Sequence, residues 1–232
     1  MKLRIASYNI RKAVGLDWKR KPDRIIAVIA EIDADIVLLQ EADRRLGSRA
    51  GVLPIEELRH SLDYEIADVA TRPLSHGWHG NAILFRKALS LVSARRLELP
   101  RAEPRGAVSG SFDVGRSQPL QVISAHLSLL KTFRRRQYRA LGQQVGQESG
   151  GSFAVIGGDF NDRSSDAGIR HCFGENFQVV SPGPSFHTKY PVWSLDRFVV
   201  GDEVEAKADQ VHSSDLARRA SDHLPIYVDI EV

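Results

Sequence analysis

The stretch from residue 153 to residue 162, Phe-Ala-Val-Ile-Gly-Gly-Asp-Phe-Asn-Asp, places the tightest limit on how this chain folds. A short apolar run breaks at two glycines, and an acid and an amide follow two positions apart. This pattern is typical of a buried strand with polar groups at its end. In an extended chain Asp159 and Asn161 project from one face, and the glycines let a ligand or another backbone come close. A strand followed by an Asx turn explains the same letters equally well.

The length and composition are those of one globular domain. The chain has 232 residues, of which 42% are hydrophobic and 26% are charged. These values suit a single sizeable core. No Pro/Gly/Ser-rich segment or block of like charge is long enough to act as a linker, and no internal repeat is present. We therefore expect one domain over residues 1–232.

Charge and cysteine content limit the substrates and the cellular compartment that suit this chain. The formal net charge is +3 and the sequence pI is near 9.1, so a phosphorylated or polyanionic substrate is tolerated but not demonstrated. Cys172 is the only cysteine, which excludes an internal disulfide and fits a reducing compartment. The first residues lack the apolar core of a signal peptide, and no segment is long and apolar enough to span a membrane. These features predict a cytoplasmic protein without a transmembrane segment.

Hydrophobic periodicity predicts more strands than helices, with hairpins mixed among strand-helix-strand connections. That mixture favours an α/β fold of two packed mixed sheets with helices outside. No G-x-G-x-x-G or G-x-x-x-x-G-K-[ST] motif supports a nucleotide-binding fold. The expected strands are 3–9, 36–39, 64–69, 81–86, 89–97, 107–114, 120–125, 153–158, 193–200 and 226–230, and the expected helices are 22–31, 52–62 and 131–147.

Polar residues recur at the ends of these strands. Each has an ordinary structural explanation when taken alone, as a cap, a turn residue, a satisfied histidine or a surface ion pair. Their repeated placement at strand ends favours a common site. The residues are Asn9, Glu41, His126, Asp159, Asn161, Asp196, Asp222 and His223.

Six short motifs in this order resemble those of the endonuclease/exonuclease/phosphatase superfamily. The resemblance spans nearly the whole chain and implies a deoxyribonuclease I-like fold, a four-layer sandwich of two mixed β-sheets flanked by helices. It also implies hydrolysis of phosphoester bonds with a divalent metal, Mg²⁺ or Mn²⁺. The motifs are Ser7-Tyr8-Asn9-Ile10, Leu39-Gln40-Glu41, Ser124-Ala125-His126-Leu127, Gly157-Gly158-Asp159-Phe160-Asn161, Leu195-Asp196-Arg197 and Ser221-Asp222-His223-Leu224-Pro225.

At two positions the chain departs from the pattern of one branch of the superfamily. The exonuclease III type typically has a tyrosine where this chain has His126, and an acid or amide where it has Arg11. His126 is similar instead to the histidine of the branch with deoxyribonuclease I, neutral sphingomyelinases and inositol-polyphosphate phosphatases. Arg105 and Asn81 resemble its phosphate-contacting arginine and its G-N strand opening. The whole set looks most like small bacterial metal-dependent hydrolases of this superfamily.

The resemblance implies a role for each motif residue. Asn9, Glu41 and Asp222 are the expected metal ligands, an oxygen-only set of the kind that holds magnesium. His223, oriented by Asp196, either activates the attacking water or, when protonated, contacts the phosphoryl oxygens. Asp159 is the competing candidate for water activation, and the sequence leaves that choice open. The expected contacts to the non-bridging phosphate oxygens come from Arg105, His126, Asn161 and Asn81.

Three functions follow as alternatives. The first is a metal-dependent phosphodiesterase or nuclease that uses in-line attack by water. The second is a phosphatase or a phospholipid head-group hydrolase on the same core, and the third, less favoured, is a non-catalytic binding protein. The basic segment 131–139 can guide a polyanion, but a solvated helix face is the simpler interpretation. Loops 47–54, 71–80 and 183–193 are expected to decide the substrate, nucleic acid or phospholipid, and no obligate protein partner is evident.

Overall fold

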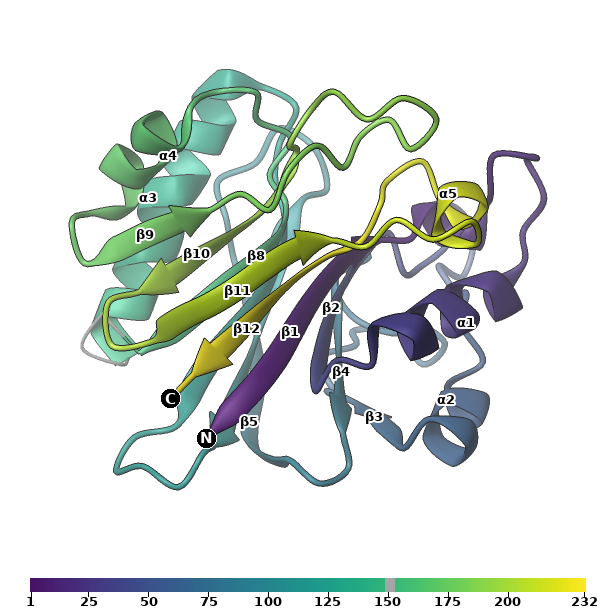
Figure 1. Cartoon of the computed structure of the whole chain (residues 1–232), viewed down its shortest axis with the longest axis horizontal. Helices are drawn as coiled ribbons and strands as arrows, with labels where there is room; N and C mark the ends of the chain where they lie inside the picture. Colours follow the sequence, from purple (N-terminus) through teal and green to yellow (C-terminus); the bar gives the residue numbers. More distant parts are fainter. Residues whose placement is uncertain (149–152) are drawn as a thin grey trace.

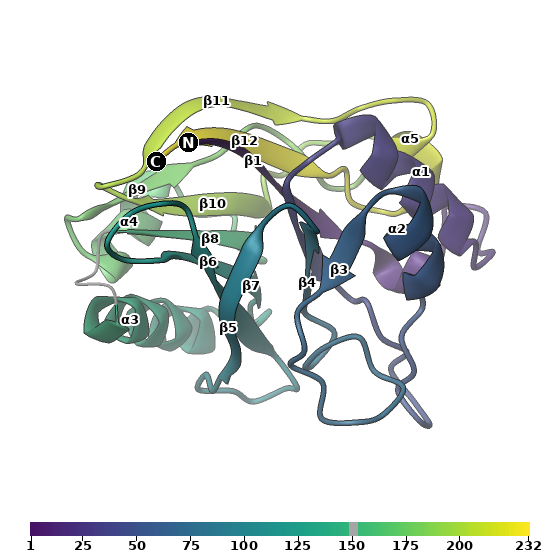
Figure 2. The same cartoon turned by 90° about the horizontal axis from the view of Figure 1, so that it is seen from below.

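The structure is a computed structural model that describes residues 1–148 and 153–232. Within these residues twelve strands form two six-stranded sheets, and five α-helices lie outside them. Figure 1 and Figure 2 show α1, α2 and α5 on one side of the molecule and α3 and α4 on the other. The predicted four-layer α/β sandwich is therefore confirmed.

The first sheet is mixed and has the strand order β11-β12-β1-β2-β4-β3. Only β1 and β2 run parallel, and Asn9 lies opposite Gln40 where the two strands end. The strands are β1 Lys2–Asn9, β2 Ile36–Gln40, β3 Tyr64–Ile66, β4 Ala82–Arg86, β11 Glu205–Val211 and β12 Ile226–Glu231.

The second sheet has the order β5-β6-β7-β8-β10-β9 and the same plan. Its one parallel pair is β7 and β8, in which His126 lies opposite Asp159. Each sheet thus places one parallel pair near its centre, with polar residues at the carboxyl ends. The strands are β5 Ser90–Leu97, β6 Gly106–Asp113, β7 Leu120–His126, β8 Ala154–Asp159, β9 Phe177–Val180 and β10 Asp196–Gly201.

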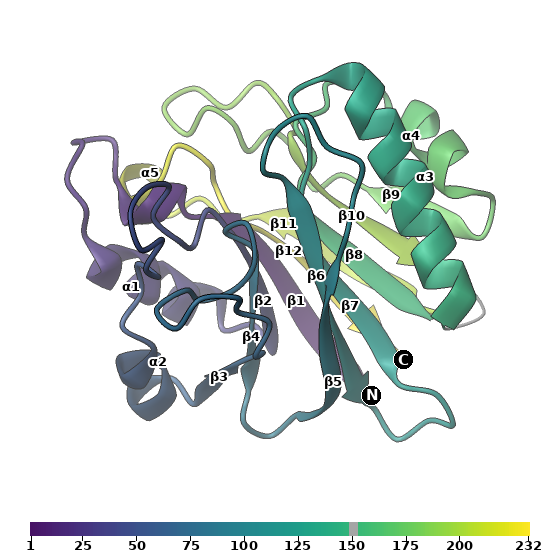
Figure 3. The same cartoon turned by 180° about the vertical axis from the view of Figure 1, so that it is seen from behind.

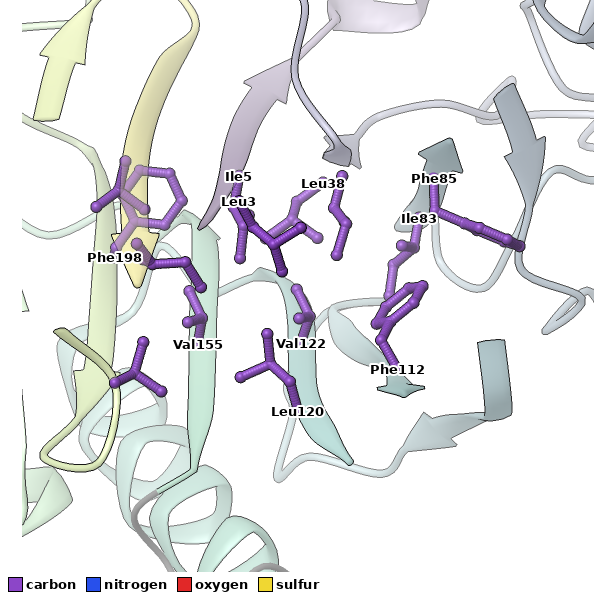
Figure 4. Close-up of a cluster of buried hydrophobic side chains, with 14 of the residues drawn as sticks. Leu3, Ile5, Leu38, Ile83, Phe85, Phe112, Leu120, Val122, Val155 and Phe198 are labelled. Carbon is purple, nitrogen blue, oxygen red and sulfur yellow. The ribbon is translucent and has the colours of Figure 1, made fainter. Parts of the chain in front are cut away.

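The main core lies between the sheets (Figure 4). Side chains of alternate strand residues enter it from both sides, as the period of two requires. The first sheet contributes Ile5 and Leu38, and the second contributes Val122, Val155 and Phe198. All five are fully buried. This shared apolar layer fixes how the two sheets sit on each other.

Helices cover the two outer faces. The first sheet carries α1 Pro22–Ile32, α2 Ile55–Ser61 and α5 Ala217–Ala220, and the second carries α3 Lys131–Glu148 and α4 Asp166–Phe173. The predicted helix 22–31 is confirmed: Pro22 is its first residue, and Asp33 ends it in the left-handed region. Among the described residues no helix is both long and apolar enough to cross a membrane.

The buried face of α3 differs from the predicted one. We expected Phe133, Ala140, Leu141 and Val145 to line it, with the arginines elsewhere. Phe133 is only half-buried, whereas Arg134 is buried. The Arg134 guanidinium donates hydrogen bonds to the backbone oxygens of Ser128 at 3.0 Å and Leu129 at 2.7 Å. Its Nε atom lies 3.4 Å from Oδ2 of Asp162, which supplies the opposite charge, so Arg134 anchors the loop before α3.

Two α-helices, α4 and α5, and two strands, β9 and β11, are absent from the sequence-based prediction, and the strand predicted over 64–69 is shorter. It spans only Tyr64–Ile66. The helix α4 and the strand β9 are brief, with eight and four residues. The edge strand β11 is largely exposed, so it lacks the alternation of apolar and polar residues that reveals a half-buried strand. None of these four elements carries a predicted site residue.

The strands closest to the site approach each other because glycines replace side chains there. A Cβ atom on Gly157 would lie 2.7 Å from the ring of Phe198 and 2.8 Å from Leu38 in the other sheet. A Cβ atom on Gly158 would lie 1.8 Å from the backbone oxygen of Ala125 in β7. The second clash is with backbone, which cannot rotate away.

We predict that Gly158→Ala lowers the free energy of unfolding by about 2 kcal/mol or more, because an added methyl group overpacks the β7–β8 pair. Urea denaturation measures the change. Gly168→Ala in α4 is the control, because its Cβ would lie 3.7 Å from the nearest heavy atom, Ser165 Oγ, and alanine favours a helix. Equal stability of Gly158→Ala and the parent protein would contradict the argument.

Candidate active site

Asp159, the last residue of β8, lies at the centre of the polar cluster. Its side chain is buried. The amide of Asn9 donates to its Oδ2 across the sheets at 3.0 Å, and the backbone N–H of Asn161 donates to its Oδ1 at 3.0 Å. The Nε2 atoms of His126 and His223 lie 3.3 Å and 3.7 Å from Oδ2. Groups from both sheets therefore converge on one carboxylate.

The environment keeps this carboxylate ionised. Burial alone would raise the pKa of Asp159, but the positive charge of His223 and the contact with His126, with a smaller effect of the Asn9 hydrogen bond, outweigh burial and hold the pKa well below its ordinary value. Asp159 can therefore accept hydrogen bonds or a proton at neutral pH. It cannot serve as a proton donor there.

His223 forms a dyad with Asp196. The Nδ1 atom of His223 lies 2.8 Å from Oδ2 of Asp196, and the hydroxyl of Ser185 donates to the same oxygen. Burial would lower the pKa of His223, but the carboxylates of Asp196 and Asp159 outweigh burial and raise the pKa to about 9. The ring of Phe186 covers His223, with 4.8 Å between the centroids. His223 is thus a buried imidazolium at neutral pH.

Glu41 follows β2 in the left-handed region, with a φ of 55°. Gly80 makes room for this turn, because a Cβ there would lie 3.3 Å from the Cα of Glu41. The Lys12 ammonium forms an ion pair with the Glu41 carboxylate, and Arg11 lies 3.3 Å from Asp222. Both expected metal-ligating carboxylates thus face a cation of the chain itself.

Arg105 and His126 share one wall of the site. A guanidinium N–H of Arg105 donates to Nε2 of His126, and both residues line the same pocket as Glu41. Burial, with the charge of Arg105 as a smaller cause, lowers the pKa of His126. Asn161 is half-buried, and its amide donates to the backbone oxygen of Leu127 at 3.0 Å.

The structure therefore gathers nearly all of the predicted residues at one place. Asn9, His126, Asp159, Asp196 and His223 form a connected set of hydrogen bonds and close charge contacts. Of the other predicted residues, Glu41, Arg105, Asn161 and Asp222 lie at its edge.

Asn81 is not part of this group. Its side chain is fully buried, and its amide donates to the backbone oxygens of Trp78 at 3.3 Å and Gly106 at 3.1 Å. Asn81 thus links the β3–β4 loop to the residue that follows Arg105. The sequence suggested contact with phosphate, and the geometry gives it a position behind the wall of the pocket.

Two residues of the site were missed by the sequence analysis. Lys12 reaches Glu41 because Arg11, Lys12 and Ala13 all adopt left-handed backbone angles, which turn the chain back over the end of β2. Ser185 meets Asp196 because of the loop before β10. Neither residue has a sequence signal. For Lys12 the reason is that left-handed angles in three successive non-glycine residues are rare and not encoded by a motif.

A model of the Endonuclease/Exonuclease/phosphatase family matches residues 6–223. The chain belongs to this family. The match begins within β1 and ends on His223, so it contains every predicted site residue. The resemblance of the motifs is therefore confirmed at the level of the family.

Relatives and solved structures agree with this assignment. The uncharacterized protein YbhP of Escherichia coli strain K12 is 26% identical over 221 residues, which cover 88% of this chain and 86% of YbhP. A family member from Bacteroides vulgatus has a TM-score of 0.79 at 20% identity and covers 100% of this chain and 99% of that one. TDP2 of D. rerio, solved with a single-strand DNA product, has a TM-score of 0.75 at 19% identity, with coverages of 100% and 99%. At these identities the structures show a shared fold.

The raised pKa of His223 makes the stability of the metal-free protein depend on pH. Below about pH 6.5 this histidine is charged in both the folded and the unfolded chain, and its full contribution is present. Between that pH and about 9 the folded chain holds the proton more tightly, so the contribution is lost as the pH rises.

We expect this loss to be on the order of 3 kcal/mol. Urea denaturation in chelator, at several pH values from pH 6 to pH 10, measures it as the difference between the parent protein and His223→Gln. His171→Gln, at an exposed histidine of α4, is the control and should follow the parent. A pH-independent difference would show that His223 is not held as an imidazolium.

Proposed function

We propose that this chain is a divalent-metal-dependent phosphodiesterase that hydrolyses its substrate by in-line attack of water, with nucleic acid as the leading substrate. One observation carries the proposal. A buried, ionised Asp159 is held between Asn9 and two histidines, beside a pocket that contains a carboxylate and an arginine suited to phosphate. Phosphodiester hydrolysis requires a water acceptor, fixed donors and positive charge together.

The surroundings of Glu41 support a metal site. An ammonium group already lies against its carboxylate, so this position favours a cation. Glu41, Asn9 and Asp222 offer oxygen ligands, which Mg²⁺ and Mn²⁺ prefer. A bound divalent ion would neutralise charge on the phosphoryl group and make a water more acidic.

A second group of possible ligands is less suitable. Ligand atoms of Asp159, Asp196 and His223 lie within 4.8 Å of one another. However, His223 is protonated when its pKa is about 9, and an imidazolium has no free lone pair to offer a metal. We therefore assign the metal to Glu41, Asn9 and Asp222, and assign proton handling to Asp159 and His223.

The two ionisation states define the roles of the central residues. Asp159 carries negative charge and lacks a proton, so it orients the attacking water and accepts its proton as the bond to phosphorus forms. His223 carries a proton, so it donates a hydrogen bond to the phosphoryl group or to the leaving oxygen. Asp196 holds the imidazolium in place through Nδ1. Neighbouring groups with opposite pKa shifts are typical of acid and base pairs.

Two donors suit the remaining phosphate oxygens. The buried Arg105 guanidinium donates toward His126 and faces the pocket. Asn161 lies beside Asp159, where its amide stands next to the expected line of attack. Fixed charged and amide donors of this kind hold a phosphorus atom in line without reorganisation during the reaction. The single-strand DNA product in TDP2, which has this fold, supports nucleic acid as the substrate.

We predict that Asp159→Asn and His223→Ala each reduce kcat by about 10²-fold or more, because each removes an acid–base group. The assay uses bis(p-nitrophenyl) phosphate and a single-stranded oligonucleotide, each with Mg²⁺, Mn²⁺ or EDTA. The control Asp202→Asn removes an exposed carboxylate beyond the end of β10 and should retain the activity of the parent.

Two results would count against the proposal. Near-parental hydrolysis by either site variant would contradict the proton role assigned to that residue. Activity that survives EDTA would contradict the proposed metal dependence. Hydrolysis of the small diester but not of the oligonucleotide would keep the catalytic assignment and redirect the choice of substrate.

A phospholipid head-group hydrolase is the second candidate, and exposed apolar loops favour it. Leu129 and Trp193 are 61% and 40% exposed. The guanidinium of Arg163 stacks 4.2 Å from the ring centroid of Trp193, and Arg163 lines a second pocket with Leu129 and Asn161. Tyr190 and Val192, on the loop of Trp193, are also exposed. Apolar side chains mixed with cations are typical of surfaces that enter an anionic lipid interface.

For this candidate we predict that Leu129→Ser/Trp193→Ser weakens binding to phosphatidylglycerol–phosphatidylcholine vesicles by about tenfold, because less apolar surface enters the interface. Vesicle co-sedimentation measures the binding, and bis(p-nitrophenyl) phosphate hydrolysis should stay unchanged. Val92→Ser, at an exposed residue of β5, is the control. Failure of the parent protein to bind anionic vesicles would eliminate the phospholipid candidate.

A further inference from the structure

Beside Glu41 and His126 the site opens into a pocket of about 290 Å³. Its walls include the β2–α2 loop and the β3–β4 loop, which Figure 3 shows on the same side of the molecule. We call it the arginine pocket. Its cations are Lys12, Arg44, Arg45, Arg49, Arg72 and Arg105, and its carboxylates are Glu41, Asp43 and Glu103.

The three carboxylates are already engaged. Asp43 accepts hydrogen bonds from the hydroxyl of Ser75 at 2.6 Å and the backbone N–H of His76 at 2.7 Å. Glu103 accepts from the hydroxyl of Ser128 at 2.6 Å, and Glu41 faces Lys12. Two of the acids therefore hold loops in place, and the third belongs to the expected metal site.

The loop arginines are not engaged in this way. In the part of the chain that the structure describes, Arg44, Arg45, Arg49 and Arg72 form no ion pair with a carboxylate. Arg72 donates a long hydrogen bond of 3.4 Å to the backbone oxygen of Gly47, which joins the two loops. The positive charge of Arg45 is felt at both Lys12 and Arg105, where it helps to lower their pKa values after the larger effect of burial.

The cationic excess in this pocket is large for the molecule. Six cations face three carboxylates, an excess as large as the formal net charge of +3 of the whole chain. Concentrating like charges in a concave site is unfavourable without an anionic ligand. In the proposed function the scissile phosphoryl group already has Arg105 and Asn161 as donors. A pocket close to the ~300 Å³ at which small-molecule sites begin holds more than that one group.

From these observations we infer that the arginine pocket binds a second phosphoryl group of the substrate, one that is not cleaved. This inference rests on the proposed phosphodiesterase and narrows its substrate class to diesters that carry another phosphate. Guanidinium groups bind phosphate oxygens in pairs of hydrogen bonds, so unpaired arginines suit such a ligand. The second phosphate belongs either to the next nucleotide of a strand or to a phosphorylated lipid head group.

Matched substrates that differ by one phosphate test the inference. One arm compares the dinucleotide TpT with pTpT and TpTp, and the other compares glycerophosphoinositol with glycerophosphoinositol 4-phosphate. We expect the parent protein to show a KM at least tenfold lower for the phosphorylated member of one arm, and that arm identifies the source of the phosphate. In Arg49→Gln/Arg72→Gln this preference should disappear, with kcat and the KM for bis(p-nitrophenyl) phosphate within twofold of the parent.

The control is Arg116→Gln/Arg170→Gln, which removes the same charge at exposed positions in the β6–β7 turn and in α4. It should keep the preference. The inference is overturned if the parent prefers neither phosphorylated substrate, or if the preference survives in Arg49→Gln/Arg72→Gln. An equal loss for the pocket and control variants also overturns it, because the effect would then be one of net charge.

The same proteins separate this inference from the proposed function. If no substrate is hydrolysed, including bis(p-nitrophenyl) phosphate, the phosphodiesterase proposal fails and calorimetry tests the pocket alone. In that case at least tenfold weaker binding of pTpT or glycerophosphoinositol 4-phosphate by Arg49→Gln/Arg72→Gln than by the control supports the pocket. Equal affinities overturn it.

Discussion

The hydrogen bond between the Asn9 amide and the Asp159 carboxylate is the contact on which the site depends. It joins the end of β1 in one sheet to the end of β8 in the other at 3.0 Å. Gly157 lets the two sheets approach each other next to this bond, because a Cβ atom there would lie 2.8 Å from Leu38 in the first sheet. The apolar layer between the sheets sets their relative position. The core and the site are thus two ends of one interface, and a slip between the sheets would disperse the polar cluster.

Two histidines approach the same carboxylate but differ in charge. His126 has Arg105 beside its Nε2 atom, and burial with this neighbour lowers its pKa. His223 has Asp196 at Nδ1, and the carboxylates around it overcome burial and raise its pKa to about 9. The difference arises from the second neighbour of each ring rather than from Asp159. His126 therefore accepts a hydrogen bond from a guanidinium, whereas His223 carries a proton.

Much of the fold and of the site was predictable from sequence because both follow strand ends. Asn9, His126 and Asp159 end buried strands with clear apolar runs, and parallel pairing brings such ends to one edge. The strand β11 was missed because its exposed residues carry no apolar alternation. The buried Arg134 was missed because charge normally indicates exposure, and only the tertiary fold supplies the backbone oxygens that accept its hydrogen bonds.

The arginine pocket could not be predicted from the sequence, for a different reason. Arg45 and Arg49 follow β2, whereas Arg72 precedes β4, and neither loop has a period or motif. The sheet order places β4 directly beside β2, so the two loops meet above the same strand ends. The hydrogen bond from Arg72 to the backbone oxygen of Gly47 joins the two loops. Loop proximity of this kind follows from topology, which a single sequence specifies only through the whole fold.

Lys12 gives the site a built-in counterion. Its ammonium lies against the Glu41 carboxylate, so the acidic position does not carry uncompensated charge when no other cation is present. If Glu41 binds a divalent ion as proposed, loading is an exchange of one cation for another, with displacement of a flexible side chain. Sites in which clustered acids repel one another often fold only with their metal. Here Lys12 neutralises Glu41, so the site can fold without a bound ion.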